Sequence, residues 1–258
     1  MRFAWPVVVA LVLSPWTSAR AALPSKLPAS APEAVGMDAR PLDEIDQVVA
    51  EGIEAGEMPG CLVMIGRRGK VVFFKAYGDR QVEPDRVRMT TDTVFDMASL
   101  TKPVATATSV MILVQEGKLR LCDRVARHVP EFGQNGKEAI TVFQLLTHQG
   151  GLIADNSLAD YEDGPEKAWE RIFALGTRVP PGSKFIYTDV GYMVLGELVR
   201  RVCGKNVHEF SQEHIFRPLG MTETGYLPAE PLRRRAAPTE KRNGQWVRGE
   251  VHDPRAYR

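Results

Sequence analysis

Hydrophobic residues follow two different patterns of spacing in the first third of the chain. Between residues 42 and 53 they are spaced as on one face of a helix, and Gly56 or Gly60 ends the pattern. Two apolar runs follow, CLVMIG at 61–66 and VVFFKAYG at 71–78, separated by a glycine-containing connection. This arrangement predicts a β-hairpin. Because neither run alternates with polar residues, we expect helices to cover the sheet on both faces.

The segment from Pro103 to Gln115 carries no charge, and Gly117 ends it. Small and apolar residues occupy every side of this pattern, which predicts a helix that is buried all round. Four more helices are predicted: a short one opened by a capping box at Thr141–Gln144, one at about 169–175, one at 190–202 ending at Gly204, and one at about 207–216.

The last stretch, residues 228–258, has only a weak strand signal at 245–247. Two confident strands are too few for a sheet that must cover all of these helices. We therefore expect the C-terminal strands of a larger domain to be absent from this chain.

The N-terminus has the pattern of a secretory signal peptide. Arg2 precedes an apolar stretch at 3–13, and Ala19-Arg20-Ala21 has the small-x-small form of a cleavage site. The stretch is shorter than the ~20 residues of a membrane-spanning helix, although an uncleaved anchor is the alternative. We expect residues 1–21 to be a signal peptide, 22–33 a linker and 34–258 the functional domain. The mature protein would then be secreted or periplasmic, without a membrane span.

Composition and charge exclude some functions. The formal net charge of +1 gives no global field that would attract nucleic acid. Cys61, Cys122 and Cys203 lack metal-ligand spacing, and the sequence selects no disulfide pair among them. His208 and His214 are too far apart for the i, i+4 spacing of a zinc-binding helix. The sequence therefore points to no metal.

The segment FDMASLTKPVATA, at 95–107, contains the first candidate site. Ser99 and Lys102 are three positions apart and so lie on one face of a helix. A lysine at the start of an apolar helix is poorly solvated, which favours its neutral form and makes it a plausible proton acceptor for the serine hydroxyl. The helix N-terminus would also favour a developing oxyanion. The alternative is a surface lysine near a helix start.

The second candidate site is FIYTDVGYMVLGELV at 185–199. Tyr187 and Asp189 stand just before an apolar helix, on a turn that could face Ser99. A phenol near a lysine can act as a general base, and Asp189 can hold the lysine or a substrate amide. In the alternative, Asp189 caps the helix and Tyr187 packs at its entry. For His148, after a short apolar helix, a structural role is favoured over general base catalysis.

Together these motifs resemble the serine β-lactamase and penicillin-binding-protein superfamily. ASLTK followed by YTD before an apolar helix is similar to its class C β-lactamase-related branch, which includes carboxylesterases and D-Ala-D-Ala-directed peptidases. PEAVGMDARPLDEID, LLTHQGGL, PPGSKFIYTDVGYMVLGELV and FRPLGMTETGY also resemble landmarks of the branch, so the likeness covers roughly residues 32–227. It implies an α+β fold, with an antiparallel sheet flanked by helices plus an all-helical lobe.

The resemblance also implies a mechanism. Ser99 would be the nucleophile, Lys102 would assist proton transfer, Tyr187 would be the general base and Asp189 would bind substrate. The reaction would be acyl transfer from small esters, amides or peptidoglycan-derived substrates to water, without a metal or organic cofactor. The alternative is a non-catalytic or inactive truncated member that binds cell-wall peptide or acyl ligands. The oligomeric state is left open.

Two positions depart from the superfamily pattern. Its Tyr-x-Asn appears here as Tyr187-Thr188-Asp189, a substitution that resembles the esterase-like members more than true β-lactamases. Its third motif, Lys- or His-x-Gly on a late strand, has no match, since His252-Asp253-Pro254 has the wrong third residue. In the superfamily that strand supplies an oxyanion N–H, and loss of one such donor costs about 10²–10³ in rate.

Overall fold

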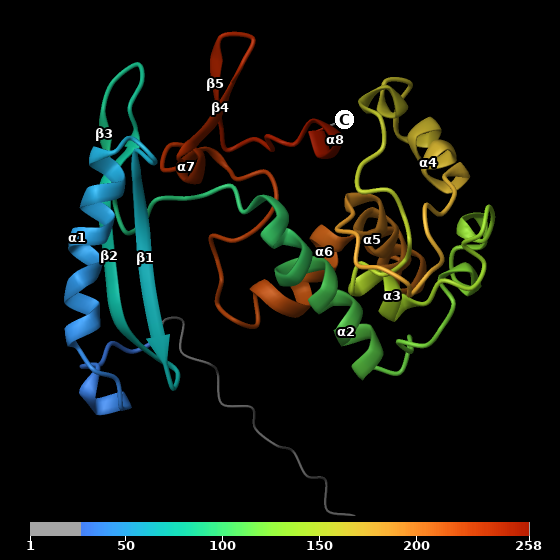
Figure 1. Ribbon diagram of the computed structural model, residues 1–258, viewed down its shortest axis with the longest axis horizontal. Helices are drawn as coiled ribbons and strands as arrows, with labels where there is room; N and C mark the ends of the chain where they lie inside the picture. Colours follow the sequence, from blue (N-terminus) through green and yellow to red (C-terminus); the bar gives the residue numbers. More distant parts are fainter. Residues whose placement is uncertain (1–26, 258) are drawn as a thin grey trace, which may run out of the picture.

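The computed structural model describes residues 27–257. The predicted signal peptide and the beginning of the predicted linker lie outside these residues. Within them, no helix is long and apolar enough to cross a membrane. A long β-hairpin with one helix beside it forms one side of the molecule, and a group of helices forms the other (Figure 1).

The first side is built by α1 (Arg40–Glu54), β1 (Gly60–Arg67) and β2 (Lys70–Gln81). The two strands pair antiparallel, with Cys61 opposite Tyr77, and α1 packs against β2. A short third strand, β3 (Val87–Arg88), extends the sheet beyond β2. The predicted helix and hairpin are thus confirmed, and the apolar runs do form the strands.

The prediction that helices cover both faces of this hairpin was wrong for the described residues. Met64 and Phe74 are partners in the strand register, and their exposed fractions are 56% and 42%. Within the described part of the chain α1 packs on the hairpin, and no other segment buries this pair. Apolar composition alone therefore overstated how much of the sheet is enclosed.

The second side is helical. It contains η3 (Lys102–Ala107, a π-helical stretch), α2 (Thr108–Gln115), α3 (Val142–Leu146), α4 (Pro165–Ala174), α5 (Asp189–Cys203), α6 (Val207–Ser211) and η7 (Gln212–Phe216, also π-helical). Side chains of α2, α3 and α5 form its core, and Leu113, Leu145 and Leu198 are completely buried. Gly204 ends α5 in the left-handed conformation, as its position predicted. The predicted helices are all present.

The helix after Lys102 is not buried all round, which corrects the second expectation. Val110 and Leu113 have no exposed surface, whereas Val104 and Met111 are 37% and 45% exposed. An uncharged helix can thus present one side to a core while its other side stays uncovered by the described residues.

The last part of the chain lies between the two sides (Figure 1). It contains α7 (Glu230–Arg233), the antiparallel hairpin of β4 (Pro238–Arg242) and β5 (Gln245–Arg248), and α8 (Pro254–Tyr257). The main chain of Val94, shortly before Ser99, bonds to Arg235 and Ala237 on both of its polar groups. The fold is therefore α+β, with small antiparallel sheets beside a helical group, as the resemblance implied.

Candidate active site

Ser99 lies exposed in a single 3₁₀ turn, Ala98–Leu100, directly before η3. The turn is tight because Ala98 adopts a left-handed conformation, with φ of 45°, which a residue with a side chain rarely takes. The Asp96 carboxylate supports it by accepting a hydrogen bond from the Ala98 amide at 2.8 Å. The local sequence thus places the Ser99 hydroxyl in an exposed position just before a helix begins.

Lys102 contacts both sequence motifs. Its ammonium donates to Ser99 Oγ at 3.1 Å and lies 2.6 Å from Asp189 Oδ1 as an ion pair. Burial acts to lower the pKa of Lys102, but Asp189 and then Tyr187 outweigh it, so this pKa is raised above its usual value. The expectation that desolvation makes the lysine neutral was therefore wrong, because it omitted the carboxylate that faces the amine.

Tyr187 lies beside the same ammonium. Lys102 Nζ is 5.0 Å from the centre of the Tyr187 ring, and 46% of the tyrosine remains exposed. Its ring rests on His148, whose ring centre is 4.5 Å away. The phenol is thus available to a ligand on one side and supported on the other.

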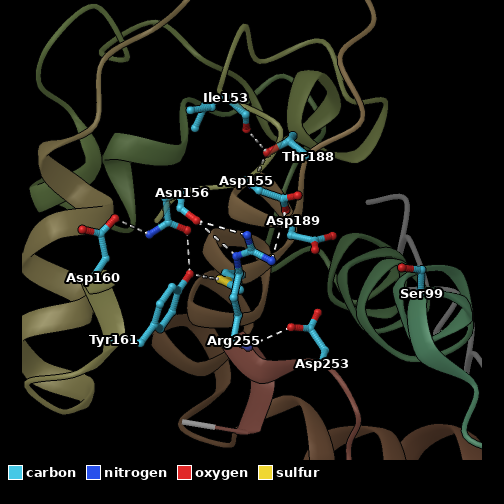
Figure 2. Close-up of polar contacts among 12 residues, drawn as sticks. Ser99, Ile153, Asp155, Asn156, Asp160, Tyr161, Thr188, Asp189, Asp253 and Arg255 are labelled. Atoms are coloured by element: carbon cyan, nitrogen blue, oxygen red, sulfur yellow. Dashed lines mark hydrogen bonds and ion pairs between the residues drawn. The ribbon is translucent and has the colours of Figure 1, made fainter. Parts of the chain in front are cut away.

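Thr188, rather than Asp189, caps α5. Its hydroxyl accepts a hydrogen bond from the Gly191 amide at 3.3 Å and donates to the Ile153 carbonyl at 2.6 Å. The alternative that Asp189 is merely the helix cap was wrong, because Thr188 occupies that position and leaves the Asp189 carboxylate to Lys102. Figure 2 shows Thr188 turned towards Ile153, with Ser99 on the neighbouring helical segment.

The chain near its C-terminal end contributes two contacts beside the site that the sequence did not predict, through His252 and Arg255. His252 Nδ1 lies 2.8 Å from Asp96 Oδ2, so the carboxylate that supports the serine turn also binds this segment. The Arg255 guanidinium donates to the Asn156 carbonyl through Nε and Nη2, at 3.2 Å each (Figure 2). One sequence signal was available. Asp96 lies three residues before Ser99, and an aspartate often accepts a hydrogen bond from the backbone N–H two residues further on, so Asp96 could have been predicted to support the serine turn.

The structure thus brings together the four predicted residues Ser99, Lys102, Tyr187 and Asp189. They supply a hydroxyl with, beside it, an ammonium, a phenol and a carboxylate, which are groups that can hold or move a proton. In the part of the chain that the structure describes, no group of three or more His, Cys, Asp or Glu side chains is placed to hold a metal. All three cysteines are free.

A sequence profile of the Beta-lactamase family matches residues 45–258. The chain belongs to the Beta-lactamase family. A protein of Escherichia coli K12 named "Putative D-alanyl-D-alanine carboxypeptidase" is 32% identical over 245 residues, which cover 87% of this chain and 56% of that protein. The chain therefore spans little more than half the length of this relative.

Solved structures of the Beta-lactamase fold agree with this assignment. A class C β-lactamase superposes with a TM-score of 0.70 at 21% identity over 81% of this chain and 57% of its own, a likeness that concerns the fold alone. A family VIII carboxylesterase has a TM-score of 0.64 and 27% identity over 77% of this chain and 55% of its own. The predicted membership of the β-lactamase and penicillin-binding-protein superfamily is confirmed.

Proposed function

We propose that this chain carries the catalytic residues of an exported serine hydrolase that acts on small esters or amides through an acyl-enzyme. One observation carries the proposal: the Ser99 hydroxyl accepts a hydrogen bond from Lys102, and that ammonium also faces Tyr187 and Asp189. The cation thus lies largely shielded beside a nucleophile and a general base that both remain exposed.

The mechanism divides the roles among these residues. Ser99 Oγ attacks the acyl carbon as its proton passes to the phenolate of Tyr187, whose charge the Lys102 ammonium stabilises. The tetrahedral oxyanion then collapses, and the leaving alcohol or amine takes the proton from Tyr187. Water attacks the acyl-serine, gives its proton to Tyr187 and releases the acid, and Ser99 recovers the proton.

The names of relatives support a small acyl donor as substrate. One relative is named as a putative D-alanyl-D-alanine carboxypeptidase and another as a carboxylesterase. The first name implies cleavage of an amide bond and the second cleavage of an ester. Peptidoglycan-derived peptides and simple esters are therefore the first substrates to test. The predicted signal peptide favours a secreted or periplasmic location, where such peptides are found.

Labelling with a fluorophosphonate probe tests the proposal. The probe should modify the protein at Ser99, and Ser99→Ala should abolish the mass increase. Ser30→Ala is the control, because the Ser30 hydroxyl donates to the adjacent Ala31 carbonyl, away from the site. Labelling that survives Ser99→Ala would contradict the proposed nucleophile.

A second candidate is a module that binds acyl or peptide ligands without turning them over. It is favoured by Asp189 in place of the superfamily's asparagine and by the unmatched third motif, whose strand would supply an oxyanion N–H. Saturable binding of a D-Ala-D-Ala peptide without an acyl-enzyme mass increase would support it. Measurable hydrolysis of an ester that depends on Ser99 would exclude it.

A further inference from the structure

His148 clamps the segment that carries Tyr187. Its carbonyl accepts a hydrogen bond from the Ile186 amide at 2.9 Å, and its Nδ1 accepts one from the Thr188 amide at 3.1 Å. These two bonds flank Tyr187 along the chain, and the histidine ring lies against the tyrosine ring with an angle of 35° between the planes. His148 thus holds Ile186 through its backbone carbonyl, and it holds Thr188 and the Tyr187 ring through its imidazole.

The backbone of His148 is specialised for this contact. Its φ is 56°, in the left-handed region, and its amide bonds to the Leu145 carbonyl at the end of α3. A residue with a side chain rarely takes this conformation, because its Cβ comes too close to the following carbonyl oxygen. The conformation lets the ring turn from α3 towards residues 186–188, forty positions further along the chain, where it is 92% buried.

We infer that His148 is a positioning residue for the general base Tyr187, an inference that rests on the proposed function. Because Nδ1 accepts the Thr188 N–H, it carries no proton, and the clamp requires this form of the ring. A protonated His148 would lose the acceptor and release Thr188.

The charged surroundings keep the ring in that form. The titratable groups that face it are Lys102, Tyr187, Asp189 and Tyr192, from three different elements. Burial lowers the pKa of His148, and the Lys102 ammonium lowers it further, while Asp189 opposes them more weakly. A protonated ring would also place a second cation beside Lys102, so the clamp opens only below the lowered pKa of His148 and not yet at the ordinary histidine value of about 6.5.

Three variants separate positioning from a purely structural role. His148→Ala removes the clamp. His148→Asn keeps an acceptor oxygen close to the place of Nδ1, tolerates the left-handed backbone and does not titrate. His128→Asn is the matched control, because His128 lies on the helical side of the molecule against Asp123 and outside the site.

Hydrolysis of p-nitrophenyl acetate should show the difference. We expect kcat to fall about 10²-fold in His148→Ala, since misplacing a catalytic group by about 1 Å has that effect. His148→Asn should recover most of the loss and should lack the decline in kcat that the unsubstituted protein shows in acid, once the pH falls below the lowered pKa of His148. His128→Asn should keep both the rate and the pH profile. A folded His148→Ala protein with unchanged kcat and pH profile would overturn the inference.

Amide hydrogen exchange gives a readout that does not depend on activity. His148→Ala should abolish protection of the Thr188 amide, and His148→Asn should retain it. If the unsubstituted protein neither hydrolyses esters nor labels at Ser99, the proposed function fails while exchange at Thr188 still decides whether His148 clamps this segment. If the Thr188 amide is equally protected in His148→Ala, that result alone contradicts the inference.

Discussion

Lys102 Nζ lies closer to the carboxylate of Asp189 than to the hydroxyl of Ser99, at 2.6 Å against 3.1 Å. The two side chains come from the beginnings of two different helical segments, η3 and α5. Both are largely shielded from solvent, with side-chain exposures of 14% and 21%. The charge on the lysine is therefore set by a residue 87 positions away as much as by the serine motif itself.

Asp189→Asn should lower the pKa of Lys102, because burial then acts on the amine without the opposing carboxylate. The ammonium form of Lys102 is therefore favoured at present. In the proposed mechanism this ammonium stabilises the charge on Tyr187, so fluorophosphonate labelling of the variant should decline at a lower alkaline pH than labelling of the unsubstituted protein. Labelling measured from pH 5 to 11 checks this, and an alkaline decline at an unchanged pH would contradict the role given to the Lys102 charge.

Lys137→Met should destabilise the fold. Lys137 has no exposed surface, and its ammonium donates to the carbonyls of Gln134, Phe173 and Leu175. Methionine would leave these acceptors buried without a donor, which costs about 3 kcal/mol in the free energy of unfolding. Urea denaturation measures the loss. Lys118→Met, at a half-exposed position, should change this free energy by no more than about 0.5 kcal/mol.

His252→Gln should weaken the protein in acid more than in alkali. Asp96 raises the pKa of His252 in the folded state, so its stabilising effect is complete below about pH 6.5 and is lost as the pH rises through the raised value. The ring is partly exposed and screened by solvent, so the loss at pH 6 should be less than about 1 kcal/mol. Unfolding at pH 6 and pH 9 tests this. His208→Gln serves as control, and an effect as large at pH 9 would contradict the ion pair.

Ala98→Gly should stabilise the turn that carries Ser99 and yet slow its reaction. Glycine removes the penalty of the left-handed conformation at φ of 45°, but it also loosens the unfolded chain, so the net gain is up to about 1 kcal/mol. A looser turn holds the hydroxyl less firmly, and labelling should become several-fold slower. Ala55→Gly, at an ordinary φ of −70°, should instead destabilise. If both variants lose stability equally, the turn at Ala98 is not strained.

Local periodicity was enough to predict most of the fold. The helix at 40–54, the hairpin after it and α5 with its terminal Gly204 follow from the spacing of apolar residues and from a glycine that adopts positive φ. The contact of Ser99 with Lys102 is also local, because residues three apart share a helix face. Strand β4 was not predicted because its sequence, PTEKR, is mostly polar.

Contacts between distant segments could not be predicted in the same way. The sequence suggested Asp189 as a partner of the lysine but did not show that its effect exceeds desolvation. Nothing local in LLTHQGGL indicates that His148 reaches across to Thr188. The pairing of Asp96 with His252 joins residues 156 positions apart, and the sequence had considered His252 only for a different motif.

The uncovered pair of Met64 and Phe74 affects how an assay on this polypeptide must be read. A hydrophobic ester or a dye such as ANS can bind non-covalently to these exposed apolar side chains of the hairpin, away from Ser99. Short, hydrophilic acyl donors, with covalent modification of Ser99 as the readout, avoid mistaking such binding for activity.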